Sequence, residues 1–156
     1  MTNFDEFAPY GHPRQQAARF VVAGVDYEVY FTQITDENPW DSAVEFPEGF
    51  RLPEYAKHFD VTFDTKANRL CRTPFRRVEE LPAGAGTRVL KCVESIIIDH
   101  YTTFNVGLYT FAPADLKLSS VYCRFVTMKK HRGSTIEVGL EPEGRANVLR
   151  TPKFYE

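Results

Sequence analysis

The stretch that decides the fold is residues 84–101, which read GAGTRVLKCVESIIIDHY. Its apolar residues recur at spacings of three and four, and this period predicts an amphipathic helix that continues to Phe104. Thr87 is the expected N-cap, because its hydroxyl can accept a hydrogen bond from an early helix N–H group. The apolar face of this helix should supply much of the core and consists of Val89, Leu90, Val93, Ile96, Ile97, Tyr101 and Phe104.

The glycines ahead of this helix indicate an anion site. Gly84 and Gly86 have no side chains, so a ligand can approach the backbone closely there. The free N–H groups and the positive end of the helix dipole would then favour a phosphate. The spacing fits neither the Walker A motif nor the dinucleotide fingerprint. The other interpretation is a turn that only redirects the chain.

Size and composition predict one globular domain, residues 1–156. Aromatic residues make up 14% of the chain, which favours a sheet-rich core because rings pack well on a pleated surface. The sequence has no apolar run long enough to span a membrane, and its acidic start does not resemble a signal peptide. The three widely spaced cysteines suit a reducing compartment, so we expect a cytoplasmic protein with no membrane partner.

The order of periodic segments predicts an α+β fold, with a mainly antiparallel sheet and two principal helices packed on it. The second helix is predicted at residues 115–131, where apolar residues again follow the helical period. Strands are predicted at residues 19–23, 27–34, 58–64, 72–78, 106–111 and 134–140.

Three segments lack regular periodicity. Residues 1–18 are expected to form an irregular N-terminal arm whose aromatic residues could lie across a hydrophobic groove, and residues 141–156 a loose C-terminal tail. Residues 35–57 should form a long acidic loop. Loops of this length usually carry function or contact a partner.

The histidines do not indicate a metal site. His58 alternates with Asp60 on the face of the predicted strand 58–64 that we expect to be solvated, and this spacing alone fixes no coordination geometry. Metal binding or acid–base chemistry on this row is the alternative. His100 lies beside the apolar face of the first helix, where we expect a structural histidine with hydrogen-bond partners.

The glycine turn and the segments after it resemble the acyl-CoA loop of GNAT-type N-acetyltransferases. In that family a glycine-rich loop precedes a helix with paired aliphatic residues, then a strand, then a helix that carries a tyrosine. Residues 84–90 fit the loop and helix, residues 106–111 the strand, and residues 121–125 the tyrosine helix. A GNAT-like order of elements would therefore cover about residues 58–140.

The resemblance implies an acyl-CoA-dependent N-acetyltransferase that uses acetyl-CoA. Tyr122 would be the general acid for the leaving thiolate, and Glu79 or Glu80 would lie near the position of the base. The backbone groups implied in holding the pyrophosphate are those of Gly84, Ala85, Gly86, Thr87 and Arg88. The chain also resembles small uncharacterised phage and prophage proteins, which share its order of elements and imply no settled activity.

The leading functional hypothesis from the residues is a small non-catalytic accessory protein, encoded by a phage, that binds a protein partner and needs no cofactor. The GNAT-type enzyme is the alternative. The expected partner contacts combine aromatic and acidic residues of the long loop, namely Trp40, Phe46, Phe50, Asp36 and Asp41.

Charge is unevenly distributed and suggests a third hypothesis. Residues 1–65 hold 12 acids and 4 bases, whereas residues 66–156 hold 9 acids and 15 bases. The two halves can neutralise each other within one fold, or the basic side can meet an anion such as nucleic acid. The residues predicted to contact nucleic acid are Lys66, Arg69, Arg72, Arg76 and Arg77.

Overall fold

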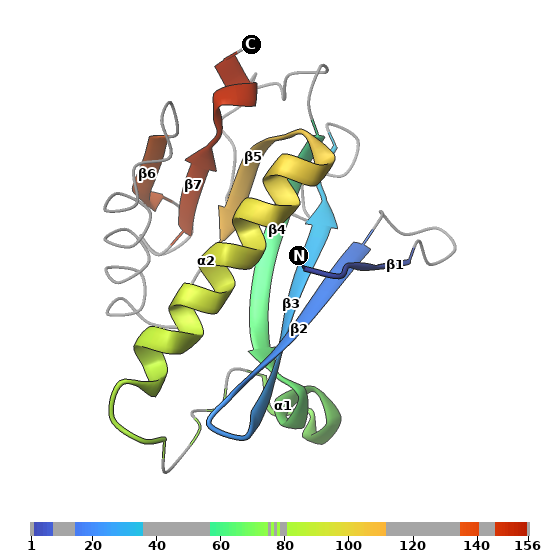
Figure 1. Cartoon of the computed structure of the whole chain (residues 1–156). Helices are drawn as coiled ribbons and strands as arrows, with labels where there is room; N and C mark the ends of the chain where they lie inside the picture. Colours follow the sequence, from blue (N-terminus) through green and yellow to red (C-terminus); the bar gives the residue numbers. More distant parts are fainter. Residues whose placement is uncertain are drawn as a thin grey trace.

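The computed structural model describes residues 2–7, 15–35, 57–74, 76, 78, 81–111, 135–140 and 146–155. These residues contain a seven-stranded sheet with the order β1-β2-β3-β4-β5-β7-β6 (Figure 1). Every neighbouring pair is antiparallel except β4 and β5, which are parallel. The predicted α+β class with a mainly antiparallel sheet is therefore confirmed. The elements are β1 (Asp5–Phe7), β2 (Gln15–Val22), β3 (Val25–Gln33), β4 (Lys57–Thr65), α1 (Lys66–Cys71), α2 (Ala85–Phe104), β5 (Val106–Phe111), β6 (Thr135–Leu140), β7 (Ala146–Arg150) and the 3-10 helix η2 (Pro152–Tyr155).

The strands predicted at residues 19–23 and 27–34 are present as β2 and β3, which form a hairpin. Ala23 and Gly24 connect the strands with φ angles of 51° and 75°, and two such residues match the right-handed twist of a hairpin. The hairpin is longer than predicted, because Gln15 already pairs with Thr32. The N-terminal arm is also less irregular than expected, since β1 pairs with β2 along the sheet edge.

The strand predicted at residues 72–78 is wrong for the described residues, because the chain enters α1 directly after β4. Thr65 caps this helix, and its hydroxyl accepts a hydrogen bond from the N–H of Asn68 at 3.0 Å. Arg72 then ends the helix in the left-handed region, with φ at 56°. A residue with this conformation turns the chain back and cannot continue a strand.

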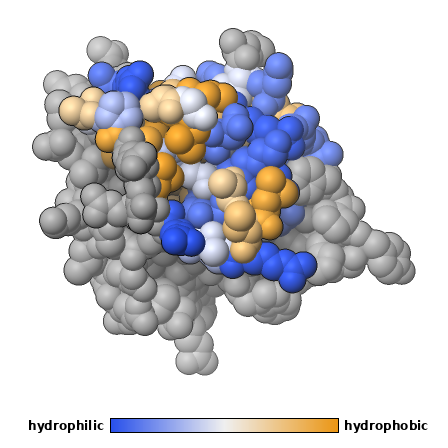
Figure 2. Space-filling view, turned by 90° about the horizontal axis from the view of Figure 1, so that it is seen from below, coloured by the Kyte–Doolittle hydropathy of each residue, from blue (hydrophilic) through white to orange (hydrophobic). Residues whose placement is uncertain are grey.

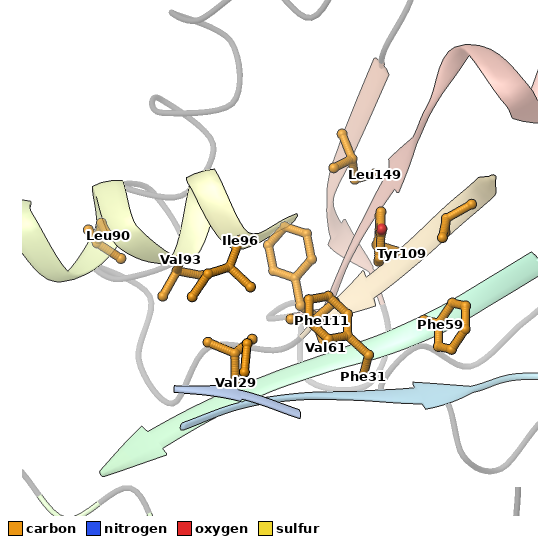
Figure 3. Close-up of a cluster of buried hydrophobic side chains, with 12 residues drawn as sticks. Val29, Phe31, Phe59, Val61, Leu90, Val93, Ile96, Tyr109, Phe111 and Leu149 are labelled. Atoms are coloured by element: carbon orange, nitrogen blue, oxygen red, sulfur yellow. The ribbon is translucent and has the colours of Figure 1, made fainter. Parts of the chain in front are cut away.

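The core lies between α2 and one face of the sheet (Figure 3). Leu90, Val93 and Ile96 of α2 point toward Val29 and Phe31 of β3, and all five side chains are buried. The predicted helix and its apolar face are confirmed. Burial of each such side chain stabilises the fold by roughly 2 kcal/mol before entropy is counted.

The outer face of β4 is not solvated as the sequence predicts. His58 is 3% exposed and Asp60 is 8% exposed, and the hydroxyl of Thr110 on β5 donates a hydrogen bond to Asp60. Both residues lie in the half of β4 that has β3 on one side and β5 on the other. Thr62, beyond the part paired with β5, is exposed.

The predicted loose tail is wrong for its central part, because β7 lies inside the sheet between β5 and β6. After it, Thr151 attaches the chain to the start of β5. Its N–H donates to the Gly107 carbonyl at 3.0 Å, and its hydroxyl donates to the Val106 carbonyl at 2.5 Å. The helix predicted at residues 115–131 and most of the loop predicted at residues 35–57 lie outside the described residues.

Candidate functional site

The glycine turn places the start of α2 three residues earlier than predicted. Gly84 is the N-cap, with φ at 80°, and makes no side-chain capping bond. Thr87 is therefore not the cap and lies in the first helical turn. The left-handed conformation of Gly84 accounts for this difference, because glycine adopts positive φ without the steric cost of a Cβ.

The first turn of α2 presents two backbone donors to solvent. The N–H of Ala85 donates to the Pro82 carbonyl at 3.1 Å, and the N–H of Arg88 donates to the Gly84 carbonyl at 3.2 Å. Among the described residues, no acceptor is found for the N–H groups of Gly86 and Thr87. Such groups attract anions, and the helix dipole adds to the attraction.

The charges around this turn also favour an anion. The first turn of α2 contains no acidic residue. Gly86, Thr87 and Arg88 are all exposed, and Arg88 brings a positive charge next to the two donors. The space beside Gly86 is open, because a Cβ built there would meet nothing within 4 Å. The described residues therefore leave the surface beside Gly86 unobstructed.

The core fixes the turn beside the carboxyl end of β4. Ala85 and Val89 are buried against Val22 and Tyr27 of the hairpin, and Phe63 of β4 packs on the same cluster. The chain thus runs from β4 through α1 and α2 to β5, its parallel neighbour. Ligands of α/β folds commonly bind beyond the carboxyl ends of parallel strands. Figure 2 shows this end of the molecule, with hydrophilic residues between two hydrophobic groups.

The residues implied for pyrophosphate binding do not have equal access to solvent. Gly86, Thr87 and Arg88 lie together on the surface, whereas the Ala85 side chain is fully buried and its N–H already has an acceptor. The spacing of two glycines could not show which way the residue between them faces. Tyr122, Glu79 and Glu80 lie outside the described residues, as do Trp40, Phe46, Phe50, Asp36 and Asp41.

A second polar cluster lies inside the core at the far end of α2. His100 is fully buried, and its ring stacks on Phe31 with centroids 3.8 Å apart. Its Nδ1 lies 2.7 Å from the Tyr109 hydroxyl, and its Nε2 lies 2.5 Å from Oε1 of Gln16. A neutral ring satisfies both contacts, with Nε2–H donating to Gln16 and the hydroxyl donating to Nδ1. The expected structural histidine is confirmed.

Burial keeps this cluster neutral. Desolvation, together with the positive charge of Lys57, lowers the pKa of His100 to about 3. Burial also raises the pKa of the Tyr109 hydroxyl well above its usual value of 10. Neither group therefore titrates near neutral pH, and the cluster joins β2, α2 and β5 through hydrogen bonds rather than charge.

An ion pair between the exposed Arg69 and the buried carboxylate of Glu28 joins α1 to the sheet, and sequence reasoning missed it. Arg69 binds Glu28 through two bonds, with Nε at 2.6 Å from Oε1 and Nη2 at 3.1 Å from Oε2. Arg19 lies 3.6 Å from the same carboxylate. The hydrogen bond from Arg69 holds the pKa of Glu28 below its usual value, despite burial of the carboxylate. The only signal for this pair in the sequence was that Glu28 alternates with the apolar residues Tyr27 and Val29 along the strand.

Comparison with known proteins finds no matching family model, no matching curated protein and no matching solved structure. None of the helices in the described part of the chain is long and apolar enough to cross a membrane. Within the same residues, no group of three or more metal-ligating side chains occurs.

Proposed function

We propose that this protein binds an acyl-CoA through its pyrophosphate at the start of α2 and transfers the acyl group to an amine. The observation that carries the proposal is the uncapped first turn, with the N–H groups of Gly86 and Thr87 open to solvent beside Arg88. A pyrophosphate offers several oxygen acceptors to these donors. The resemblance to GNAT-type N-acetyltransferases supports acyl-CoA as the ligand.

The chain's own residues have distinct roles in this proposal. Gly86 and Thr87 donate backbone hydrogen bonds, and the Arg88 guanidinium offsets the ligand's charge. Leu81, which packs on the core cluster, stands where the family carries Arg or Gln, so no polar side chain at that position assists. The anion contacts therefore rest on the backbone and on one cation.

The proposed transfer moves the acyl group from sulfur to nitrogen. The amine attacks the thioester carbonyl and loses a proton, and the carbon–sulfur bond breaks. Glu79 or Glu80 would accept the proton from the amine, and Tyr122 would protonate the leaving thiolate. These roles rest on the resemblance.

A thermal-shift titration with acetyl-CoA tests the binding step. At about 100 times its dissociation constant, a ligand that binds only the folded chain stabilises it by about 2.7 kcal/mol. The wild type should therefore show a rising midpoint as acetyl-CoA is added. Gly86→Glu should abolish this rise, because the new carboxylate occupies the open donors and repels the pyrophosphate.

The matched control is Ser95→Glu, which adds the same charge at an exposed position further along α2. The rise of 1.5 Å per residue places it roughly 13 Å from Gly86 along the axis. This variant should respond to acetyl-CoA as the wild type does. An unfolding midpoint of the wild type that does not change with acetyl-CoA would contradict the proposal. Equal rises of the midpoint in the wild type and in Gly86→Glu would contradict it as well.

The non-catalytic binding of a protein partner is the second candidate function. Val21 and Leu70 are exposed large hydrophobic residues, at 62% and 64%. Val21 lies two residues from Arg19 on β2, and Leu70 follows Arg69 on α1, so both flank the Glu28 ion pair. We take Val21 and Leu70 as the candidate contact residues of this second function.

Capture of partners from the native host tests this candidate. The double variant Val21→Ser/Leu70→Ser should retain the fold and lose the captured partner. A chain without residues 36–56 tests the acidic aromatic loop separately. If both changed chains capture the same partner as the wild type, neither surface forms the interface.

A further inference from the structure

A short positively charged segment, residues 66–78, follows β4; we call it the basic module. It contains five bases and no acid. The side chains of Lys66, Arg72 and Arg76 are exposed, and none of them makes an ion pair with another described residue. Of the module's bases that the structure describes, only Arg69 is neutralised, by Glu28. The module therefore keeps three unneutralised cations on its described surface.

Hydrogen bonds fix the backbone that carries these cations. Asn68, which is 7% exposed, donates from Nδ2 to Asp64 at 2.7 Å and to the Arg76 carbonyl at 2.9 Å. Thr73 makes two further hydrogen bonds to Asn68. Its N–H donates to the Asn68 carbonyl at 3.0 Å, and its hydroxyl donates to Asn68 Oδ1 at 3.1 Å. Arg76 thus lies against the helix that begins with Lys66, although ten residues separate them in the chain.

We propose that the basic module binds the phosphate backbone of a nucleic acid strand. Several cations on one hydrogen-bonded backbone segment suit repeated phosphates, because each neutralised phosphate releases condensed counterions. Backbone contacts of this kind position a strand without reading its sequence. The Glu28 pair contributes indirectly, since it fixes α1 to the sheet and leaves Lys66, Arg72 and Arg76 free for the ligand.

Fluorescence anisotropy with a labelled single-stranded DNA of mixed sequence, about 20 nucleotides long, tests this surface over a range of salt concentrations. Three phosphate contacts predict that log affinity falls against log salt with a slope of about −2. Lys66→Glu/Arg76→Glu removes two of the contacts. The magnitude of its slope should fall below about 1, and its affinity at low salt should drop at least roughly tenfold.

The control is Lys91→Glu/Ser95→Glu/Thr103→Glu, which makes the same total change of charge on exposed residues of α2 outside the proposed anion site. It should bind DNA with nearly the wild-type slope. No binding by the wild type at low salt, or binding without salt dependence, would overturn the proposal. So would equal losses in this control and in Lys66→Glu/Arg76→Glu, because net charge alone would then explain them. Lys66→Ala/Arg76→Ala replaces the reversed pair if that pair fails to fold.

This proposal and the acyl-CoA proposal fail separately. Lys66→Glu/Arg76→Glu should leave the acetyl-CoA response unchanged, because its substitutions lie on the basic module. Gly86→Glu should leave the salt slope for DNA unchanged.

Discussion

At the scale of single residues, His100 shows how a polar ring is held within an aromatic core. Phe31 stacks on the imidazole, while Phe4 and Phe59 approach it edge-on. A buried donor or acceptor without a partner costs about 1–3 kcal/mol, and here both ring nitrogens have partners. The hydrogen bonds therefore make the position specific for a neutral histidine.

This environment predicts a loss of stability in acid. The folded chain holds the pKa of His100 at about 3, below the value of 6.5 in the unfolded chain. Between these values the unfolded chain binds a proton that the folded chain does not, so stability falls as pH falls through this range. From about pH 7 to about pH 5, His100 should account for a loss of about 2 kcal/mol.

Urea unfolding of the wild type and of His100→Gln at both pH values measures this contribution. The variant should be less stable at neutral pH, because glutamine fits the ring site poorly. Its dependence on pH should be weaker than that of the wild type by about 2 kcal/mol. Identical pH profiles would show that a group other than His100 causes the acid sensitivity.

At the scale of elements, α2 combines a core function with the candidate site. Its apolar face packs on the sheet over several turns, and its first turn remains open to solvent. Gly84 and Gly86 differ in backbone conformation. Gly84 has a positive φ, whereas Gly86 lies within the helix with free space beside it.

The two glycines should therefore respond in opposite directions to alanine. Gly84→Ala should lower the free energy of unfolding by about 1 kcal/mol, because the left-handed conformation strains a residue with a Cβ. Gly86→Ala should raise it by about 0.5–1 kcal/mol, because alanine favours the helix. Chemical denaturation checks both values, and each variant is the other's control. A stabilising Gly84→Ala would contradict the assigned N-cap.

At the scale of the whole molecule, residues from the first and last parts of the chain pack into one fold. The hydroxyl of Thr2 donates to Asp99 on α2 at 2.5 Å, and Phe4 packs edge-on against Phe31 and Phe104. At the other end, β7 fills the place between β5 and β6. Contacts between residues this far apart in the chain favour cooperative unfolding.

Removal of the Phe4 ring should therefore weaken the whole fold. Phe4→Ala should lower the free energy of unfolding by about 2 kcal/mol, which is less than for a fully buried phenylalanine because Phe4 is half-buried. Asn3→Ala, at the exposed neighbouring position, should change it by less than about 0.5 kcal/mol. Equal small effects of both substitutions in calorimetry would show that the arm does not contribute to the core.

The sequence was informative where structure depends on local periodicity. The hairpin, the strand at residues 106–111 and the apolar face of α2 were all predicted from it. β7 was missed because its five residues are placed by pairing with β5 and β6, and no alternation marks them. α1 was missed because Asn68 holds its turn through bonds to Asp64 and Arg76.

The candidate site was predictable only in part for the same reason. Two glycines before a helix indicated an open backbone, and the structure places Gly86 and Thr87 on the surface. Burial of Ala85 depends on Val22 and Tyr27 of the hairpin, far away in the chain. The partners of Glu28, which include an arginine 41 residues away, were equally beyond local patterns.

An amide-resolved NMR titration with acetyl-CoA tests the central claim most directly, because the claim concerns particular N–H groups. The account predicts that the largest chemical-shift changes fall on Gly86, Thr87 and Arg88, and that Gly86→Glu removes them. Inorganic pyrophosphate should shift the same amides more weakly. Shifts confined to other residues, or no shifts at high ligand concentration, would contradict the proposed site.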